Sequence, residues 1–140
     1  MATLAGLLLL TGCAGPATLS APTAPYVCLL PGEQRMLVAE LFFGRGMRGR
    51  APLTDAEWAD FAAQIVTPNF PDGFTAFGGD GQWRNPDSGQ IIGARTKILM
   101  VAAPRTPDLA QRLSAVIDAY KQRFGQQSVG VITRDSCAAF

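Results

Sequence analysis

A carboxylate and two basic side chains lie where acid–base chemistry could be carried out. Glu40 sits inside an otherwise apolar segment, and Lys97 sits in a longer apolar segment that is expected to run beside it. Arg84 follows Gln82 and Trp83 in a short motif between two turns. If these five side chains converge on a sheet face that no helix covers, a carboxylate and an amine with shifted pKa values would form a general acid–base pair. The alternative is a structural ion pair on a half-exposed sheet face, or at a dimer interface.

The composition narrows the possible chemistry. The 140 residues include no histidine, which excludes Ser-His and Cys-His catalysis and histidine metal sites. With 12 basic and 11 acidic residues the net charge is only +1, so nucleic acid is not an expected partner. We expect no cofactor, and we favour a non-enzymatic protein while keeping an enzyme as the alternative.

Two further groups of residues could bind ligands. Asp72, Asp80 and Asp87 lie on Gly-rich turns but lack the closely spaced oxygen ligands of a calcium loop, so no metal site is expected. Trp83 and the pair of Phe70 and Phe74 could stack on a ligand ring. Aromatic side chains beside turns more often close the end of a core, and that is the favoured interpretation here.

The N-terminal segment indicates how the protein is exported and anchored. Leu4 to Leu10 is an apolar run of signal-peptide length, well short of the roughly 20 residues that span a bilayer. The sequence Leu10-Thr-Gly-Cys13 resembles the lipobox of bacterial lipoproteins. By that resemblance residues 1–12 are a signal peptide and Cys13 carries the acyl chains that anchor the protein. The alternative is a buried apolar strand with an incidental cysteine.

Residues 13–27 are expected to form the lipidated cysteine and a flexible tether. From Ala14 to Pro25 the chain is uncharged, rich in Ala, Pro and Thr, and without periodicity. Ala14 is not the aspartate that marks inner-membrane retention in well-studied lipoproteins. The resemblance therefore implies the outer membrane of a bacterial cell envelope, with the protein facing the periplasm. Residues 28–140 are then expected to form a single domain.

The apolar periodicity of residues 28–140 predicts six elements. Thr54 and Glu57 form a capping-box pattern at the start of the first helix, which should end before Pro68. Gly78 to Gly81 is expected to be a turn or bulge. The expected strands are 36–43, 74–77, 90–102 and 128–133, and the expected helices are 54–67 and 106–124. This βαββαβ order predicts a ferredoxin-like α+β fold, an antiparallel sheet with two helices on one face.

Cys28 and Cys137 give an independent test of that topology. In a ferredoxin-like sheet the first and last strands are antiparallel neighbours. Cys28 lies just before the first expected strand and Cys137 just after the last, so the topology brings them together. An extracytoplasmic compartment favours a disulfide between them, and the alternative is two free thiols.

The chain resembles a family of small bacterial secreted proteins and lipoproteins that is catalogued only as a domain of unknown function. The resemblance covers about Met36 to Phe140 and is carried mainly by two motifs, Thr67-Pro-Asn-Phe-Pro-Asp-Gly-Phe-Thr75 and Gly81-Gln-Trp-Arg84. The family pattern has a glutamate shortly before the Ser/Thr-Lys of the long strand, where this chain has Ala94. The resemblance implies location and family, and it implies no activity.

Together these observations predict a membrane-tethered cell-envelope lipoprotein that serves as a binding or structural module. Met36, Val38 and Phe42 should surround Glu40 on the sheet face without helices. Since exposed apolar patches mark interfaces, a homodimer or an envelope protein partner is expected there. The alternative is a small cofactor-free enzyme, or a binder of small molecules, using a sheet-face cleft that includes Glu40 and Lys97.

Overall fold

The computed structural model describes residues 27–47 and 49–140, so the predicted signal peptide, Cys13 and nearly all of the tether lie outside the described residues. The fold is α+β, as the sequence predicted. Its sheet is antiparallel and has four strands in the spatial order β2-β3-β1-β4. The strands are β1 (Gln34–Gly44), β2 (Thr75–Arg84), β3 (Ile91–Ala103) and β4 (Gly130–Ala138).

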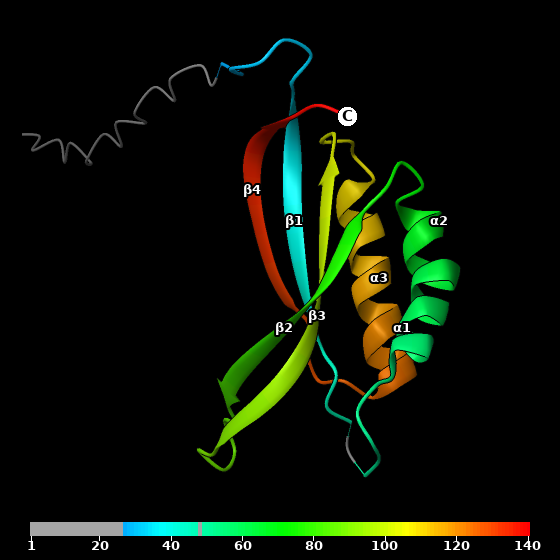
Figure 1. Ribbon diagram of the computed structural model, residues 1–140, viewed down its shortest axis with the longest axis vertical. Helices are drawn as coiled ribbons and strands as arrows, with labels where there is room; N and C mark the ends of the chain where they lie inside the picture. Colours follow the sequence, from blue (N-terminus) through cyan, green and yellow to red (C-terminus); the bar gives the residue numbers. More distant parts are fainter. Residues whose placement is uncertain (1–26, 48) are drawn as a thin grey trace, which may run out of the picture.

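Two helical segments pack on one face of this sheet (Figure 1). The first follows β1 and consists of α1 (Asp55–Phe61), a π-helical turn η1 (Ala62–Val66) and α2 (Thr67–Asn69). The second is α3 (Leu109–Phe124), which lies between β3 and β4 in the chain. The opposite face of the sheet has no helix over it among the described residues, and we call it the open face.

The first helix starts where the sequence predicted and ends later. Thr54 is its N-cap, and the reciprocal bonds of the capping box between Thr54 and Glu57 are both present. The prediction that the helix stops before Pro68 was wrong, because helical backbone continues to Asn69. Pro68 lies in the first turn of α2, where a missing N–H donor and the proline ring are tolerated, and the wide turn η1 precedes it. The Phe70 N–H bonds Val66 O at 2.9 Å.

The glycine-rich segment from Gly78 to Gly81 is strand, not the predicted turn or bulge. Its residues pair with β3 in unbroken register from Gly78 opposite Lys97 to Gly81 opposite Ala94. The hydrogen bonds of the long partner strand outweigh the weak strand preference of glycine. Beyond this point β2 and β3 extend away from the helices as a hairpin (Figure 1). We call residues 78–84 and 91–97 the arm.

The core lies between the sheet and the helices. Every second residue of β1 points into it, from Leu37 to Phe43, and is matched on β3 by Leu99, Val101 and Ala103. One end of the core is a cluster of aromatic rings with centroids 4.6–6.4 Å apart: Phe43, Trp58, Phe61, Tyr120 and Phe124. Phe70 is also buried in the core and Phe74 packs against it, as expected for aromatics that close a core. For Trp83 that expectation was wrong, because its side chain is 44 % exposed on the arm.

The predicted disulfide is present between Cys28 and Cys137, whose Cα atoms are 5.6 Å apart. It forms because β1 and β4 are antiparallel neighbours, with Arg35 opposite Cys137 in the register. The bond ties the segment before β1 to the last strand.

Candidate functional site

The strand register shows that Glu40 and Lys97 are on opposite faces of the sheet. Lys97 is opposite Phe43, whose ring lies in the core, so Lys97 is on the helix side. Glu40 is opposite Met100 on β3 and Ile132 on β4 and is on the open face. The predicted convergence of Glu40 and Lys97 was therefore wrong. The residue types gave no means to distinguish the two faces, because Lys97 is the one charged side chain among apolar neighbours from Ile98 to Val101.

The other three predicted site residues lie in the arm, away from Glu40. Trp83 is opposite Ile92 on β3, whereas Glu40 is opposite Met100. This offset along β3 corresponds to about 26 Å at roughly 3.3 Å per residue. Alternation along β2 places Gln82 and Arg84 on the same face as Lys97, and Trp83 on the open face. No single cleft contains all five side chains.

Glu40 and Lys97 instead have separate ion-pair partners. Arg134 Nη2 donates to Glu40 Oε1 at 2.9 Å across the open face. Lys97 Nζ lies 3.0 Å from Asp55 Oδ1, at the N-terminus of α1. Glu40 and Lys97 are each paired with another residue and not with one another, so the predicted acid–base pair of Glu40 and Lys97 does not form.

The helix side holds a basic cluster that the sequence did not reveal. Arg45, just after β1, donates from Nη1 to Asp55 at 3.1 Å and from Nε to the Leu53 carbonyl at 2.7 Å. The hydrogen bond from Lys97, followed by the charge of Arg45, holds the pKa of Asp55 below its usual range. Arg45 and Asp55 come together because the loop after β1 returns to the start of α1, and no spacing in the sequence signals this contact.

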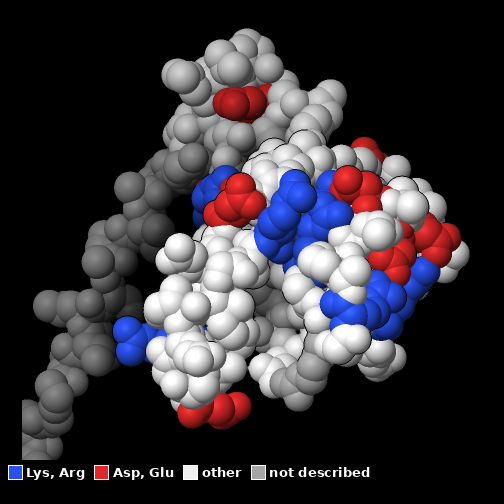
Figure 2. Space-filling model, turned by 60° about the horizontal axis from the view of Figure 1, so that its bottom comes forward, with Lys and Arg blue, Asp and Glu red and all other residues white. Residues whose placement is uncertain are grey.

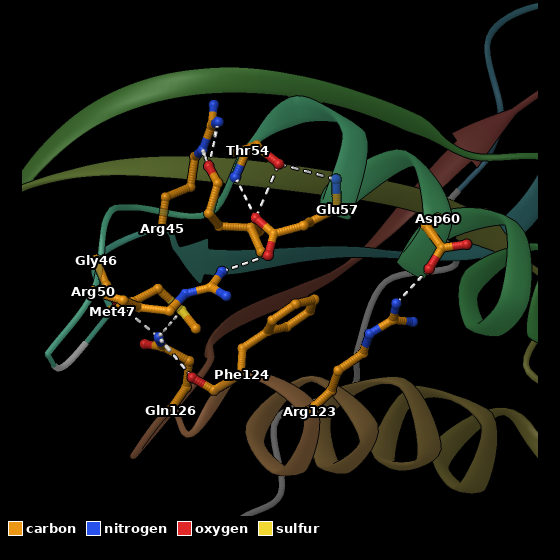
Figure 3. A network of polar contacts seen from close by, with 11 residues as sticks. Arg45, Gly46, Met47, Arg50, Thr54, Glu57, Asp60, Arg123, Phe124 and Gln126 are labelled. Carbon is orange, nitrogen blue, oxygen red and sulfur yellow. Dashed lines mark hydrogen bonds and ion pairs between the residues drawn. The ribbon is translucent and has the colours of Figure 1, made fainter.

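The neighbouring polar contacts join loops to helices and, in one case, α3 to α1 (Figure 3). Arg50 bonds Glu57, Arg123 bonds Asp60, and Gln126 Nε2 donates to the Gly46 carbonyl at 2.7 Å. The backbone N–H of Thr54, then Arg50, lowers the pKa of Glu57 to about 2. Figure 2 shows acidic and basic side chains next to each other on this side of the molecule.

Tyr120 is the most deeply buried titratable side chain at this end of the core, and it has a structural role. Its hydroxyl donates to the Gly44 carbonyl at 3.0 Å, and its ring packs against Phe43 and Phe61. Burial raises the pKa of Tyr120 well above its usual value. In the described part of the chain, the shifted pKa values of carboxyl groups are lowered, and those of Tyr120 and Arg105 are raised. Each of these pKa values therefore lies further from pH 7 than its ordinary value. A general acid or base needs the opposite shift.

The open face carries a continuous apolar surface around the pair of Glu40 and Arg134. Val38 is buried there, although it is not part of the core cluster. Ile132 and Phe77 are 50 % and 46 % exposed. The apolar side chains of this face near Glu40 include Met36, Val38, Phe42, Phe77, Ile98, Met100 and Ile132. The predicted placing of Met36, Val38 and Phe42 around Glu40 is confirmed.

Two observations concern metals and membranes. Atoms of Cys28, Glu33 and Cys137 lie within 4.8 Å of one another, but the two sulfurs are bonded to each other and offer no thiolate to a metal. In the part of the chain that the structure describes, no helix has the length and apolar character needed to cross a bilayer.

The fold resembles that of phage SAM lyase in two solved structures. In the complex with S-methyl-5'-thioadenosine the TM-score is 0.60 at 15 % identity, covering 75 % of this chain and 90 % of that one. In the apo state the TM-score is 0.58 at 14 % identity, covering 82 % and 96 %. At such low identity the likeness shows a shared fold. No curated protein matches the sequence. The family model described as "Protein of unknown function (DUF3574)" matches residues 38–140, and the chain belongs to that family.

Proposed function

We propose that this chain is a membrane-tethered lipoprotein of the bacterial cell envelope, and that residues 28–140 form one binding or structural domain without catalytic activity. We also propose that its fold is ferredoxin-like, which is supported by the spatial strand order β2-β3-β1-β4 and by the helices on one face. The observation that carries the functional proposal is the apolar open face around Glu40 and Arg134.

The proposed anchor rests on the lipobox-like sequence from Leu10 to Cys13. Cys13 would carry the lipid, residues 14–27 would hold the domain off the outer membrane, and the domain would face the periplasm. Wild-type protein should incorporate labelled palmitate and sediment with membranes, and Cys13→Ser should do neither. A Cys28→Ser variant, which removes a cysteine elsewhere, is the control and should keep both. A Cys13→Ser variant that still incorporates the label would overturn the anchor.

We propose a second copy of this chain as the partner of the open face. The face is apolar, and its two charges are of opposite sign, with Glu40 on β1 and Arg134 on β4. Such a face is complementary to itself, because a two-fold axis would place Glu40 of one copy near Arg134 of the other. Exposed apolar surface of this kind in a soluble domain marks an interface.

Neighbouring residues on β4 provide a matched pair of variants for this proposal. Ile132 is on the open face and 50 % exposed, while Val131 is on the helix side and 45 % exposed. Ile132→Asp should convert a dimer to a monomer in analytical ultracentrifugation, since it buries an unpaired charge at the interface. Val131→Asp introduces the same charge one residue away and should leave the dimer intact.

Three results would contradict a homodimer through the open face. A monomeric wild-type protein at high micromolar concentration would remove the basis for a second copy as partner. Equal dissociation by Val131→Asp and Ile132→Asp would indicate pairing along the edge of β4, not across the face. Capture of a different envelope protein on a monomeric domain, lost with Ile132→Asp, would replace the second copy by that partner.

A second candidate is a small cofactor-free enzyme or a binder of small molecules. It is favoured by the fold shared with phage SAM lyase, one structure of which contains S-methyl-5'-thioadenosine. Against it stands the separation of Glu40 and Trp83 from Gln82, Arg84 and Lys97. Isothermal titration calorimetry with S-methyl-5'-thioadenosine and with S-adenosylmethionine tests this second candidate directly. Binding of either, or release of the former from the latter, would favour this candidate over the binding module.

A further inference from the structure

A cleft at the base of the arm, on the helix side, takes no part in the proposed dimer. It has a volume of about 210 Å³ and is lined by Arg45, Gly78, Gly79, Asp80, Arg95 and Thr96. It forms where the segment after β1 runs beside β3, since the Arg45 N–H bonds the Arg95 carbonyl at 2.8 Å. The cleft therefore lies between the arm and the loop that leads to α1.

Two basic side chains, Arg45 in the lining of this cleft and Lys97 opposite its residue Gly78, are fixed in place and largely withdrawn from water. The side chain of Arg45 is 12 % exposed and that of Lys97 is 19 % exposed. Both are held by the one carboxylate of Asp55, at 3.1 and 3.0 Å. Because Asp55 supplies one negative charge to two cations, and is itself 76 % exposed, their positive charge is only partly compensated.

A third cation, Arg95, lies on the wall of the cleft with a weakly held partner. Its Nε is 4.0 Å from Asp80, and the two side chains are 78 % and 91 % exposed. Water screens such a pair strongly, so a ligand can take the place of Asp80 at little cost. Arg45, Lys97 and Arg95 against Asp55 and Asp80 leave a net charge of one positive unit.

The floor of the cleft is kept clear by a glycine. Gly78 is opposite Lys97 in the register and shares its face. A Cβ added at Gly78 would meet no atom within 4 Å, so the space above it is open. At Gly79, on the other face, a Cβ would meet Ile98 Cδ1 at 3.2 Å. A side chain at position 78 would therefore occupy the space beside Lys97.

We propose that this cleft binds the carboxylate of a small molecule, with Arg95 as its main hydrogen-bond donor and with Arg45 and Lys97 as supporting charges. The guanidinium fork matches a planar carboxylate. The single net positive charge is neutralised by one carboxylate, whereas a phosphate dianion would leave an excess of negative charge.

The test uses the full chain with its disulfide intact and three probes. N-acetylalanine carries the carboxylate, N-acetylalanine amide has the same size without the charge, and inorganic phosphate tests the choice of anion. Nuclear magnetic resonance titration should show saturable shifts of the Gly78, Gly79 and Thr96 amide signals with N-acetylalanine. The amide should leave these signals unmoved, and phosphate should bind more weakly.

Three variants assign the site. Arg95→Gln should weaken N-acetylalanine binding about tenfold, since it removes a charge-assisted hydrogen bond. Arg84→Gln removes the same charge from the far end of the arm, outside the cleft, and should bind as wild type does. Gly78→Val keeps every charge and fills the open space, and it should abolish the shifts.

The proposal is overturned if N-acetylalanine and its amide shift the same signals equally. It is also overturned if Arg84→Gln weakens binding as much as Arg95→Gln, which would show attraction to the whole arm. Tighter binding of phosphate than of N-acetylalanine would overturn the assignment to a carboxylate. A dispersed amide spectrum for each variant keeps loss of binding distinct from loss of fold.

Discussion

Glu57 shows how one side chain at this surface stabilises several neighbours at once. Its carboxylate accepts from the Thr54 backbone N–H at 2.8 Å and from the Thr54 hydroxyl at 2.9 Å, and it pairs with Arg50. These bonds act on the ionised form, which explains the pKa of about 2. Glu57 thus joins the start of α1 to the loop before it.

The first prediction concerns the pH dependence of stability at Glu57. The pKa falls from the ordinary 4.5 to about 2 on folding, so this stabilisation is complete above about pH 4.5 and is lost as the pH falls toward 2. Glu57→Gln keeps the shape and removes the titration. The variant should be less stable than wild type at pH 7, and the difference in urea midpoint should shrink between pH 4.5 and 2. A constant difference over that range would contradict the prediction.

The second prediction concerns Tyr120, whose hydroxyl bonds the Gly44 carbonyl where β1 ends. Tyr120→Phe keeps the ring contacts of the aromatic cluster and removes one hydrogen bond. It should lower the free energy of unfolding by about 1 kcal/mol, measured by urea denaturation. Phe124→Leu, which removes an aromatic ring from the same cluster and no hydrogen bond, is the comparison. An unchanged midpoint for Tyr120→Phe would mean that water replaces the bond without loss.

At the scale of elements, β2 is the part of the fold that depends most on its neighbour. Nearly all of its residues are exposed, and β3 is the strand with which it pairs. Its glycines weaken the strand intrinsically, and the register with β3 holds it in place. The arm owes its shape to this pairing and not to packing against the helices.

The two adjacent glycines give a third prediction. Gly78→Ala places a methyl group in open space and should raise the free energy of unfolding by about 0.4–1 kcal/mol, because alanine has less conformational freedom in the unfolded chain. Gly79→Ala brings the methyl group to 3.2 Å from Ile98 Cδ1 and should gain less. Thermal denaturation of both variants checks the order. Equal stabilisation would show that Ile98 moves aside freely.

At the scale of the whole molecule, the disulfide and the sheet reinforce each other. Cys28 and Cys137 are 109 residues apart in sequence, and the pairing of β1 with β4 brings them together. A cross-link that closes such a long loop removes much of the entropy of the unfolded chain.

The fourth prediction is the cost of removing that link. The double variant Cys28→Ser, Cys137→Ser should lose about 2–5 kcal/mol of unfolding free energy. Urea denaturation of the variant and of the wild type, with and without reductant, measures it. Reductant should lower the wild-type midpoint to that of the variant and leave the variant unchanged. Equal midpoints for all four samples would show that the unfolded chain is not constrained by the bond.

Residue types and their spacing were enough to predict the local features of this protein. The capping box at Thr54, the helix end at Gly125 and the core-facing residues of β1 follow from residue type and period, which act over a few neighbouring residues. The cysteine pairing could also be predicted, because the positions of two strands fixed the positions of both partners.

Which residues come together at the candidate sites depends on the tertiary structure. Which face of the sheet receives Lys97 depends on a register set by pairing between distant strands, and a shift of one residue would have exchanged the faces. The extension of strand through Gly78 likewise depended on pairing with β3, which follows it in the chain. Arg45, Asp55 and Lys97 meet because a loop returns to the sheet, and no local pattern records where a loop returns.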